Sequence, residues 1–284
     1  MMDLAGEVGR MGEAARADGE VVAAATAAER GPRYDGKSVI VTGGTRGIGR
    51  SIALAFLAAG ADVVVCGRKE PEMAPVVDGC AASFVAADVR DATQAKAVVD
   101  AAVERHGRLD VLVNNAGGAP VADAATVSPR FFERVVALNL HAAFYVSQPA
   151  NAVMQAQEAG GAIVNIGSVS GRRPAPGSSA YAAAKAGLVA LSASLALEWA
   201  PKVRVNHVTV GLANTAVDAG GFYGDATAAI DAVVPMGRAA VPADVAAACL
   251  YLASPLAGYV TGADLEVHGG GELPGFHVAT RTKG

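Results

Sequence analysis

The chain has 284 residues, of which 52% are hydrophobic and 18% charged. This composition excludes a disordered protein, and the length is enough to bury about 70–75% of the surface that the unfolded chain exposes. With 27 acidic and 23 basic residues the formal net charge is −4, which leaves no broad positive field for a phosphate backbone, so we expect no nucleic-acid partner. Three cysteines without a C-x-x-C pair favour a reducing, cytoplasmic location over a disulfide-stapled secreted protein.

The apolar stretches of the chain do not have the pattern of a leader or a membrane span. Asp3, Glu7, Arg10 and Glu13 interrupt the Ala-rich N-terminal stretch, so no secretory signal is expected there. Residues 245–263 carry no Asp, Glu, Lys or Arg, but Pro and Gly interrupt them. This run therefore predicts a buried helix followed by a turn, and we expect no membrane partner.

Short β-branched or apolar runs alternate with longer helical patterns, which predicts parallel strands joined by crossover helices. Seven strands are expected, beginning near Lys37, Asp62, Ser83, Asp110, Ala162, Val203 and Asp264. The predicted fold class is α/β: a single doubly wound, Rossmann-like domain whose seven-stranded, mostly parallel sheet has helices on both faces. We assign this domain to residues 35–271, with an N-terminal extension over 1–34 and a C-terminal tail over 272–284.

Local signals predict where three of the helices begin or end. Gly60 stands where a left-handed cap would end the first helix of the domain. Asp91, followed three residues later by Gln94, resembles a capping box at the start of another helix, and Gly107 is expected to stop that helix.

The middle and the end of the chain show two further signals. Ser128-Pro129 predicts an N-cap and the first position of a long helix, which Pro149 is expected to end or kink. Residues 211–234 are rich in Gly and Ala and only weakly periodic. We predict a mobile segment there that covers the substrate with Phe222 and Tyr223, a plain surface loop being the alternative.

A glycine-rich turn follows the first predicted strand. Gly43, Gly44, Gly47 and Gly49 crowd the passage into the next helix, where glycine permits tight backbone conformations and a close approach to a ligand. The start of that helix offers free N–H groups and the positive end of the helix dipole to a pyrophosphate. Steric needs alone also produce such turns, but the flanking strand and helix favour a dinucleotide cofactor.

The residues after the second strand indicate which dinucleotide is bound. A cofactor with a free 2′-hydroxyl would normally meet an acidic residue near this point, but the chain has Arg68 and Lys69. Arg68 and Arg46 are able to pair with a 2′-phosphate, so the predicted cofactor is NADP(H); the alternative is two solvated surface arginines. Asp88, after the third strand, suits the adenine amino group, a surface or capping aspartate being the alternative.

A second group of residues has the composition of a catalytic site. Tyr181 and Lys185 are spaced i, i+4, so they share one face of a helix. The lysine is expected to lower the pKa of Tyr181 and to make it a general acid or base near neutrality. Ser168 ends an apolar strand, where its hydroxyl can reach a substrate carbonyl. Asn139, in an otherwise apolar run, is expected either to hold a buried water near Lys185 or to cap local backbone groups.

Together these motifs resemble the short-chain dehydrogenase/reductase superfamily over about residues 37–271. The residues that carry the resemblance are a TGxxxGxG loop at 42–49, an NNAG segment at 114–117 and a YxxxK pair at 181–185, with Ser168 and Asn139 at matching positions.

The resemblance implies a role for each member of the predicted catalytic set. Tyr181 exchanges a proton with the carbonyl oxygen while hydride passes to or from a nicotinamide, and Ser168 stabilises the oxyanion. Lys185 lowers the pKa of the tyrosine and binds the nicotinamide ribose. Asn139 anchors a water in the proton relay.

The resemblance also implies a set of residues that hold the cofactor. In chain order they are Gly43, Thr45, Arg46, Gly47, Ile48, Gly49, Arg68, Asp88, Val89, Asn115, Ala116, Gly117, Tyr181, Lys185, Gly211 and Thr215. Val210 stands where the family often has a proline before the glycine, which loosens the turn on the nicotinamide side.

The expected activity is that of an NADP(H)-dependent oxidoreductase that interconverts a ketone or aldehyde and an alcohol. A redox-neutral isomerase or dehydratase on the same fold and a non-catalytic dinucleotide-binding sensor remain the alternatives. Five scattered histidines without ligand spacing predict no metal. Small residues follow Lys185 on its helix, and the resemblance implies a homotetramer or homodimer that uses this helix.

Overall fold

The computed structural model describes residues 31–215 and 224–277. Seven strands form one sheet: β1 (Ser38–Thr42), β2 (Asp62–Gly67), β5 (Ser83–Ala86), β6 (Val111–Asn114), β7 (Gly161–Ile166), β8 (Val203–Val210) and β9 (Asp264–Val267). Their order is β5-β2-β1-β6-β7-β8-β9, and every neighbouring pair is parallel. The seven predicted strands and the doubly wound α/β class are confirmed.

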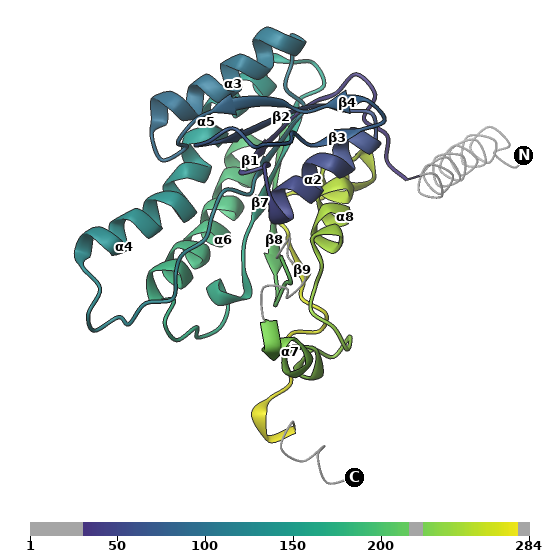
Figure 1. The fold of residues 1–284 in the computed structure, drawn as a ribbon. Coiled ribbons are helices and arrows are strands. Elements are labelled where there is room, and N and C mark those ends of the chain that lie inside the picture. The colour runs from purple at the N-terminus through teal and green to yellow at the C-terminus, as the bar shows by residue number, and fades with distance from the viewer. Residues whose placement is uncertain (1–30, 216–223, 278–284) are drawn as a thin grey trace, which may run out of the picture.

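Helices cover both faces of the sheet, as Figure 1 shows. On one face lie α2 (Gly47–Ala58) and α8 (Pro242–Ala253), and on the other α3 (Ala92–His106), α5 (Ala142–Ala156) and α6 (Ser179–Trp199). The remaining elements are α4 (Pro129–Val136), α7 (Thr227–Val233), the π-helical η1 (Ala137–His141), the 3-10 turns η2 (Val169–Gly171), η3 (Gly224–Ala226) and η4 (Pro255–Ala257), and a hairpin of β3 (Val76–Val77) and β4 (Cys80–Ala81). The sequence did not predict the hairpin, because two-residue strands leave no periodic signal.

The sheet is buried on both faces, which explains why its central strands are continuous apolar runs. Along β1, Val39 and Val41 belong to the core under α2 and α8, and Ile40 to the core under α3, α5 and α6. Phe56 fills the first of these cores and Met154 the second, and both are 0% exposed. The two layers hold the carboxyl ends of the strands at one edge of the sheet, where the predicted site residues lie.

The predicted helix ends are confirmed, with one correction. Gly60 and Gly107 have φ of 95° and 69°, the left-handed conformation that glycine adopts without strain. The side chain of Asp91 accepts a hydrogen bond of 2.9 Å from the N–H of Gln94. The reciprocal half of the predicted capping box is wrong, because the Gln94 side chain accepts from the N–H of Asp88 at the strand end (2.9 Å).

Ser128 caps α4 as predicted and accepts a hydrogen bond from the N–H of Phe131 (3.2 Å). Of the two expectations for Pro149, the end of its helix is wrong, because α5 continues through it to Ala156, and a kink stays a prediction. Proline removes only one hydrogen bond of the helix, and the apolar side of α5 is buried on both sides of it. Phe222 and Tyr223, predicted to cover the substrate, lie outside the described residues.

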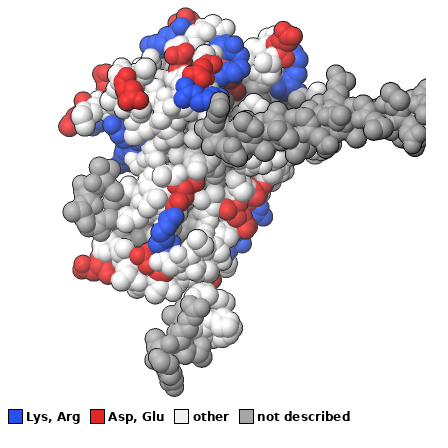
Figure 2. All heavy atoms as spheres, turned by 90° about the vertical axis from the view of Figure 1, so that its right-hand side faces the viewer, with Lys and Arg blue, Asp and Glu red and all other residues white. Residues whose placement is uncertain are grey.

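The remaining apolar runs of the sequence form helices that pack against the sheet. Among the described residues, α6 alone is long and apolar enough to cross a membrane by length and composition, but it packs along β8 and buries Leu188 and Leu195. The run 245–263 forms most of α8 and the turn after it, as predicted. On the face drawn in Figure 2, acidic and basic side chains are interspersed.

Candidate active site

The glycine turn packs so closely that side chains are excluded from it. Gly43 and Gly47 have φ of 63° and 53°, and a Cβ on Gly49 would lie 2.3 Å from the carbonyl oxygen of Gly43. The helix α2 therefore begins directly against the end of β1. The side chain of its N-cap residue, Arg46, accepts no hydrogen bond from the first turn of the helix. The first N–H groups of α2 are therefore available to another acceptor, such as an anion.

The NNAG segment fixes the end of β6 against this turn. The Asn115 amide Nδ2 donates to the carbonyl oxygens of Thr42 (3.0 Å) and Gly43 (3.2 Å). Thr42 Oγ1 accepts from the N–H groups of Asn115 and Ala116, both at 3.0 Å. Thr42 is not among the predicted cofactor residues, although it is the first residue of the TGxxxGxG loop at 42–49.

The predicted adenosine end is assembled from β1, β2 and β5. Thr45 lies beside Gly67 at the end of β2, 3.7 Å from where a Cβ on that glycine would be. Arg46 and Arg68 are exposed, and neither guanidinium has a hydrogen bond or ion pair within the described parts of the chain. Two exposed cations at this edge, of which Arg68 also lowers the pKa of Asp88, fit an anionic group of the cofactor.

The segment after β5 contributes Asp88 and Val89. The carboxylate of Asp88 pairs with the guanidinium of Arg90, and the hydrogen bond from Arg90 holds the pKa of Asp88 below its usual range. Val89 is buried in the core, so its side chain is not available to a ligand. Ile48 packs against the other core. Both residues are placed at the cofactor edge by backbone position alone.

Ser168, Tyr181 and Lys185 are brought together between the end of β7 and the first turns of α6. Ser168 Oγ accepts from the N–H of Ser170 (3.2 Å) and caps η2. The Nζ of Lys185 lies 5.6 Å from the centroid of the Tyr181 ring and donates to the carbonyl oxygen of Ile166 at 2.7 Å. The i, i+4 spacing does place the phenol and the amine on one face of the helix.

The pKa of Tyr181 differs from the prediction. Burial raises the pKa of Tyr181, and a hydrogen bond with Ser168 acts in the opposite direction. Burial also lowers the pKa of Lys185 to about 8. The expectation that Lys185 lowers the tyrosine pKa is wrong for this structure, because desolvation of the phenol outweighs other influences and the amine bonds to a carbonyl oxygen.

Asn139 lies on the π-helical η1 and is 1% exposed. Its Oδ1 accepts from the N–H of Gly118 (2.8 Å), and its Nδ2 donates to the carbonyl oxygens of Gly118 (3.0 Å) and Val135 (2.9 Å). These contacts match the capping of local backbone groups. A Cβ on Gly117 would lie 2.8 Å from Asn139 Oδ1 and 3.3 Å from Lys185 Nζ, so glycine keeps the space between these two side chains open.

Two further predicted cofactor residues lie at the same edge of the sheet. A Cβ on Gly47 would lie 3.7 Å from the carbonyl oxygen of Thr215, so Thr215 lies beside the glycine turn. The N–H of Gly211 donates to Val267 (3.0 Å), and a Cβ there would meet the His268 side chain at 2.6 Å. Throughout the described residues, no group of three His, Cys, Asp or Glu side chains could hold a metal ion.

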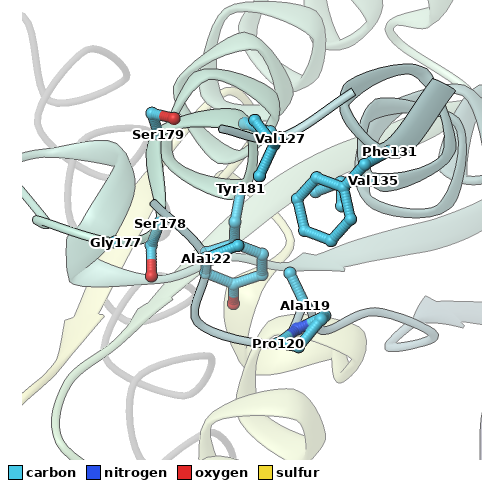
Figure 3. A pocket seen from close by; sticks show the side chains of 11 residues that line it. Ala119, Pro120, Ala122, Val127, Phe131, Val135, Gly177, Ser178, Ser179 and Tyr181 are labelled. Carbon is cyan, nitrogen blue, oxygen red and sulfur yellow. The ribbon is translucent and has the colours of Figure 1, made fainter. Parts of the chain in front are cut away.

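A pocket adjoins the phenol of Tyr181 (Figure 3). The Tyr181 ring lies between Phe131 and Val135 from α4 and the segment of Gly177 and Ser178. The other lining residues are Ala119, Pro120, Ala122, Val127, Ser179 and Ala180. The space itself is about 10 Å³, room for about one water molecule, and its described lining contains no Lys, Arg, Asp or Glu.

Comparison with known proteins places this geometry among oxidoreductases. A family model described as enoyl-(acyl carrier protein) reductase matches residues 43–272. The 3beta-hydroxysteroid dehydrogenase 1 of Eggerthella lenta is 39% identical over 250 residues, which cover 85% of this chain and 96% of that protein. Galactitol 2-dehydrogenase (L-tagatose-forming) of Cereibacter sphaeroides is 38% identical over 252 residues, which cover 84% of this chain and 96% of that protein.

Solved structures agree with the sequence comparisons. The ligand-free aldohexose dehydrogenase of Thermoplasma acidophilum superposes with a TM-score of 0.76 at 31% identity, covering 82% of this chain and 93% of that one. A variant of a Serratia marcescens short-chain dehydrogenase/reductase also gives 0.76 at 31% identity, covering 84% and 98%. The chain therefore belongs to the short-chain dehydrogenase/reductase superfamily of oxidoreductases.

Proposed function

We propose that this protein is an NADP(H)-dependent oxidoreductase that interconverts a ketone or aldehyde and an alcohol, with Tyr181 as the general acid and base. The observation that carries the proposal is that Ser168 at the end of β7 and Tyr181 and Lys185 on α6 come together, with the Lys185 amine 5.6 Å from the centroid of the phenol ring and apolar side chains beside that ring. A phenol placed in this way can give a proton to a carbonyl oxygen or take one from an alcohol.

The residues at the glycine turn fit a nicotinamide dinucleotide. The close approach of Gly43 and Gly49 and the uncapped start of α2 provide a surface for a pyrophosphate. The unpaired guanidinium groups of Arg46 and Arg68 would hold a 2′-phosphate, and Lys185 would reach ribose hydroxyls. When bound, the nucleotide supplies or accepts the hydride.

The side chains divide the remaining work. Tyr181 transfers a proton to the substrate oxygen during reduction and removes it during oxidation. The Ser168 hydroxyl donates a hydrogen bond to that oxygen as negative charge develops on it. The buried Lys185 amine, which is held in place by its bond to Ile166, would position the ribose hydroxyls of the nucleotide beside Tyr181. Asn139 holds Gly118 and Val135 in place and leaves the space beside Gly117 open for a water of the proton relay.

The apolar side chains beside the phenol favour a substrate with an uncharged, apolar part next to its carbonyl. Phe131 and Val135 face the Tyr181 ring, and no charged side chain of the described lining could pair with a carboxylate or phosphate on the substrate. The dehydrogenases of a steroid and of galactitol among the relatives are named for neutral substrates. We propose screening neutral apolar ketones and aldehydes first.

An apolar cavity on the outer surface supports a homotetramer or homodimer. Leu140, Phe144, Tyr145 and Leu191 line it where η1 and α5 meet α6, and Leu197 farther along α6 is 83% exposed. A second copy of this helix would cover these side chains. Analytical ultracentrifugation tests this, and a monomer at micromolar concentration would refute it.

The experiment that tests the function compares the wild type with Tyr181→Phe. The substitution removes one hydroxyl, so turnover should fall by at least about 100-fold while NADP(H) binding, measured by nucleotide fluorescence, persists. Loss of the absorbance of the reduced nucleotide during carbonyl conversion separates net redox chemistry from isomerisation or dehydration. Undiminished turnover by the phenylalanine variant would refute the role of Tyr181, and nucleotide binding without turnover of any carbonyl would indicate a sensor.

A further inference from the structure

A polar cluster around the buried His207, which the proposed chemistry does not use, lies next to Ser168. His207 of β8 is 1% exposed, and its Nδ1 lies 2.7 Å from Oδ1 of Asp264, the first residue of β9. The Asp264 carboxylate also accepts hydrogen bonds from Thr209 Oγ1 (2.8 Å) and from Nε of Arg172 (3.0 Å). The cluster therefore joins two strands to the segment that follows Ser168.

The hydrogen bonds of this cluster fix the tautomer of the imidazole. Burial raises the pKa of Asp264, but the hydrogen bonds from His207, Arg172 and Thr209 outweigh it and hold the pKa well below its usual range. The carboxylate is thus ionised and can only accept, so His207 Nδ1 carries the proton. The other ring nitrogen, Nε2, is buried and has no hydrogen-bond partner among the residues that the structure describes.

The unpaired side of the ring faces the residue before Ser168. A Cβ on Gly167 would lie 2.0 Å from His207 Cε1 and 2.1 Å from Nε2, so the imidazole occupies the space in which a side chain at this position would stand. On the other side of the segment, a Cβ on Gly171 would lie 2.8 Å from the backbone nitrogen of Ala186 on α6. The segment that carries Ser168 is therefore clamped between the His207 ring and the helix of Tyr181 and Lys185.

We propose that His207 is a positioning residue for Ser168, and that Asp264 and Arg172 hold its ring against Gly167. The backbone of Gly167 is bonded to β8 through its N–H and the carbonyl oxygen of Val208 (2.8 Å), and the ring fills the side-chain space of Gly167. The ring therefore limits movement of the segment after β7 and keeps the serine hydroxyl within reach of Tyr181. The inference rests on the proposed function, because turnover reports the position of Ser168.

The first test is His207→Ala, which opens a space behind Gly167. Displacing a catalytic group by about 1 Å can cost up to about 100-fold in rate, so we expect kcat to fall between about 10- and 100-fold while KM for the nucleotide is unchanged. A kcat within twofold of wild type, measured on folded protein, would overturn the proposal.

The chain offers a matched control in His106. Its Nε2 is also buried without a partner in the described structure, and its Nδ1 lies 3.8 Å from an oxygen of Asp62. Asp62 begins β2, so this pair lies at the opposite edge of the sheet. His106→Ala should keep the wild-type kcat even where it lowers the melting temperature. An equal loss of kcat in both histidine variants would show a general effect of core damage and overturn the proposal.

A compensation experiment tests the contact itself. Gly167→Ala alone places a methyl group inside the ring position and should lower both the melting temperature and kcat, whereas Gly167→Ala combined with His207→Ala gives the methyl group room. The double variant should therefore melt higher and turn over faster than Gly167→Ala. A double variant no better than Gly167→Ala in either measurement would contradict the clamp. The melting temperatures need no turnover, so they test the contact even if the proposed function fails.

Arg172→Gln keeps the test decisive if the histidine variant does not fold, because the Arg172 side chain is 46% exposed and its loss does not threaten the core. We expect a severalfold fall in kcat with nucleotide KM unchanged. Arg238→Gln, which breaks the exposed pair of Arg238 with Asp244, should leave both constants unchanged. A wild-type kcat for Arg172→Gln would show that Arg172 does not help to position Ser168. If, in addition, the double variant were no better than Gly167→Ala, the proposal would be overturned.

Discussion

The Nζ of Lys185 donates a hydrogen bond of 2.7 Å to the carbonyl oxygen of Ile166, two residues before Ser168. The amine is thus held at the end of β7 and is 4% exposed. It is the only lysine among the described residues that is buried in this way, so its protonation is linked to folding.

Stability should respond to the titration of Lys185. Burial lowers its pKa to about 8, whereas the unfolded chain has a lysine pKa of about 10.4. Between these values the unfolded state binds more protons than the folded state, so the free energy of unfolding increases as the pH rises. Below about pH 8 both states carry the charged lysine, and the full cost of burying the cation lowers the free energy of unfolding. Urea unfolding from pH 7 to pH 10 should therefore show the wild type gaining stability relative to Lys185→Met. A difference that stays constant with pH would contradict the assignment.

The two directions of the reaction should have opposite pH dependences. Burial raises the pKa of Tyr181, so the phenol holds its proton at neutral pH. Carbonyl reduction needs that proton and should decline as the pH rises toward the tyrosine pKa, whereas alcohol oxidation needs the phenolate and should increase. Profiles of kcat against pH in both directions measure this, and reduction that accelerates with pH would be inconsistent with it.

The choice of nucleotide should depend on Arg46 and Arg68. A hydrogen bond to a charged group contributes about 1.5–3 kcal/mol, so replacing either arginine with glutamine should raise KM for NADP(H) by about 10- to 100-fold and change KM for NAD(H) little. Arg50→Gln is the control, because Arg50 lies on α2 and donates to the carbonyl oxygen of Met73. Steady-state kinetics with both nucleotides decide the matter; a wild-type enzyme that prefers NAD(H) would refute this use of the arginines.

Asp110 should stabilise the amino-terminal edge of the sheet. Burial raises its pKa, but hydrogen bonds from Arg108, the N–H of Ser38 and Lys37 outweigh it and leave the pKa below its usual value. This contribution is present above the pKa of the unfolded chain, about 3.9, and is lost as the pH falls through the folded value. Asp110→Asn should lower the free energy of unfolding by about 1–3 kcal/mol at pH 7, and the difference should shrink in acid.

The control for Asp110 is Asp35→Asn. Asp35 pairs with Arg33 at an exposed position, where an ion pair contributes little, so denaturant unfolding should show no change. Equal effects of the two substitutions on the free energy of unfolding would contradict the claim that the buried hydrogen bonds of Asp110 stabilise the fold.

The sequence predicted the sheet well because its strands are buried on both faces. Runs such as β1 and β7 are mostly apolar and almost wholly buried, and the turns beyond α2 and α3 need the positive φ of Gly60 and Gly107. Features that depend on single residues were not predicted. The hairpin of β3 and β4 is too short for a period, and the cap of Gln94 depends on Asp88, which comes near only in the folded chain.

The site was predictable as a set of residues but not in its electrostatics. The i, i+4 spacing placed Tyr181 and Lys185 on one face, yet the direction of the tyrosine pKa depends on how deeply α6 packs, which spacing does not reveal. The cluster of His207 and Asp264 joins residues 57 positions apart, and each residue alone gives no signal. Tertiary packing therefore determines the properties that the local pattern leaves open.

The π-helical turn η1 makes the helix that carries Asn139 longer by one residue than a regular helix would be. The N–H of Ala142 bonds to the carbonyl of Ala137, five residues earlier. Deleting one residue here would restore regular winding and rotate α5 by about 100° about its axis. Val146 and Met154, which are buried against the sheet, would then face elsewhere. The extra residue of η1 thus sets which face of α5 turns toward the sheet, relative to the faces of α4 and η1 that carry Val135 and Asn139.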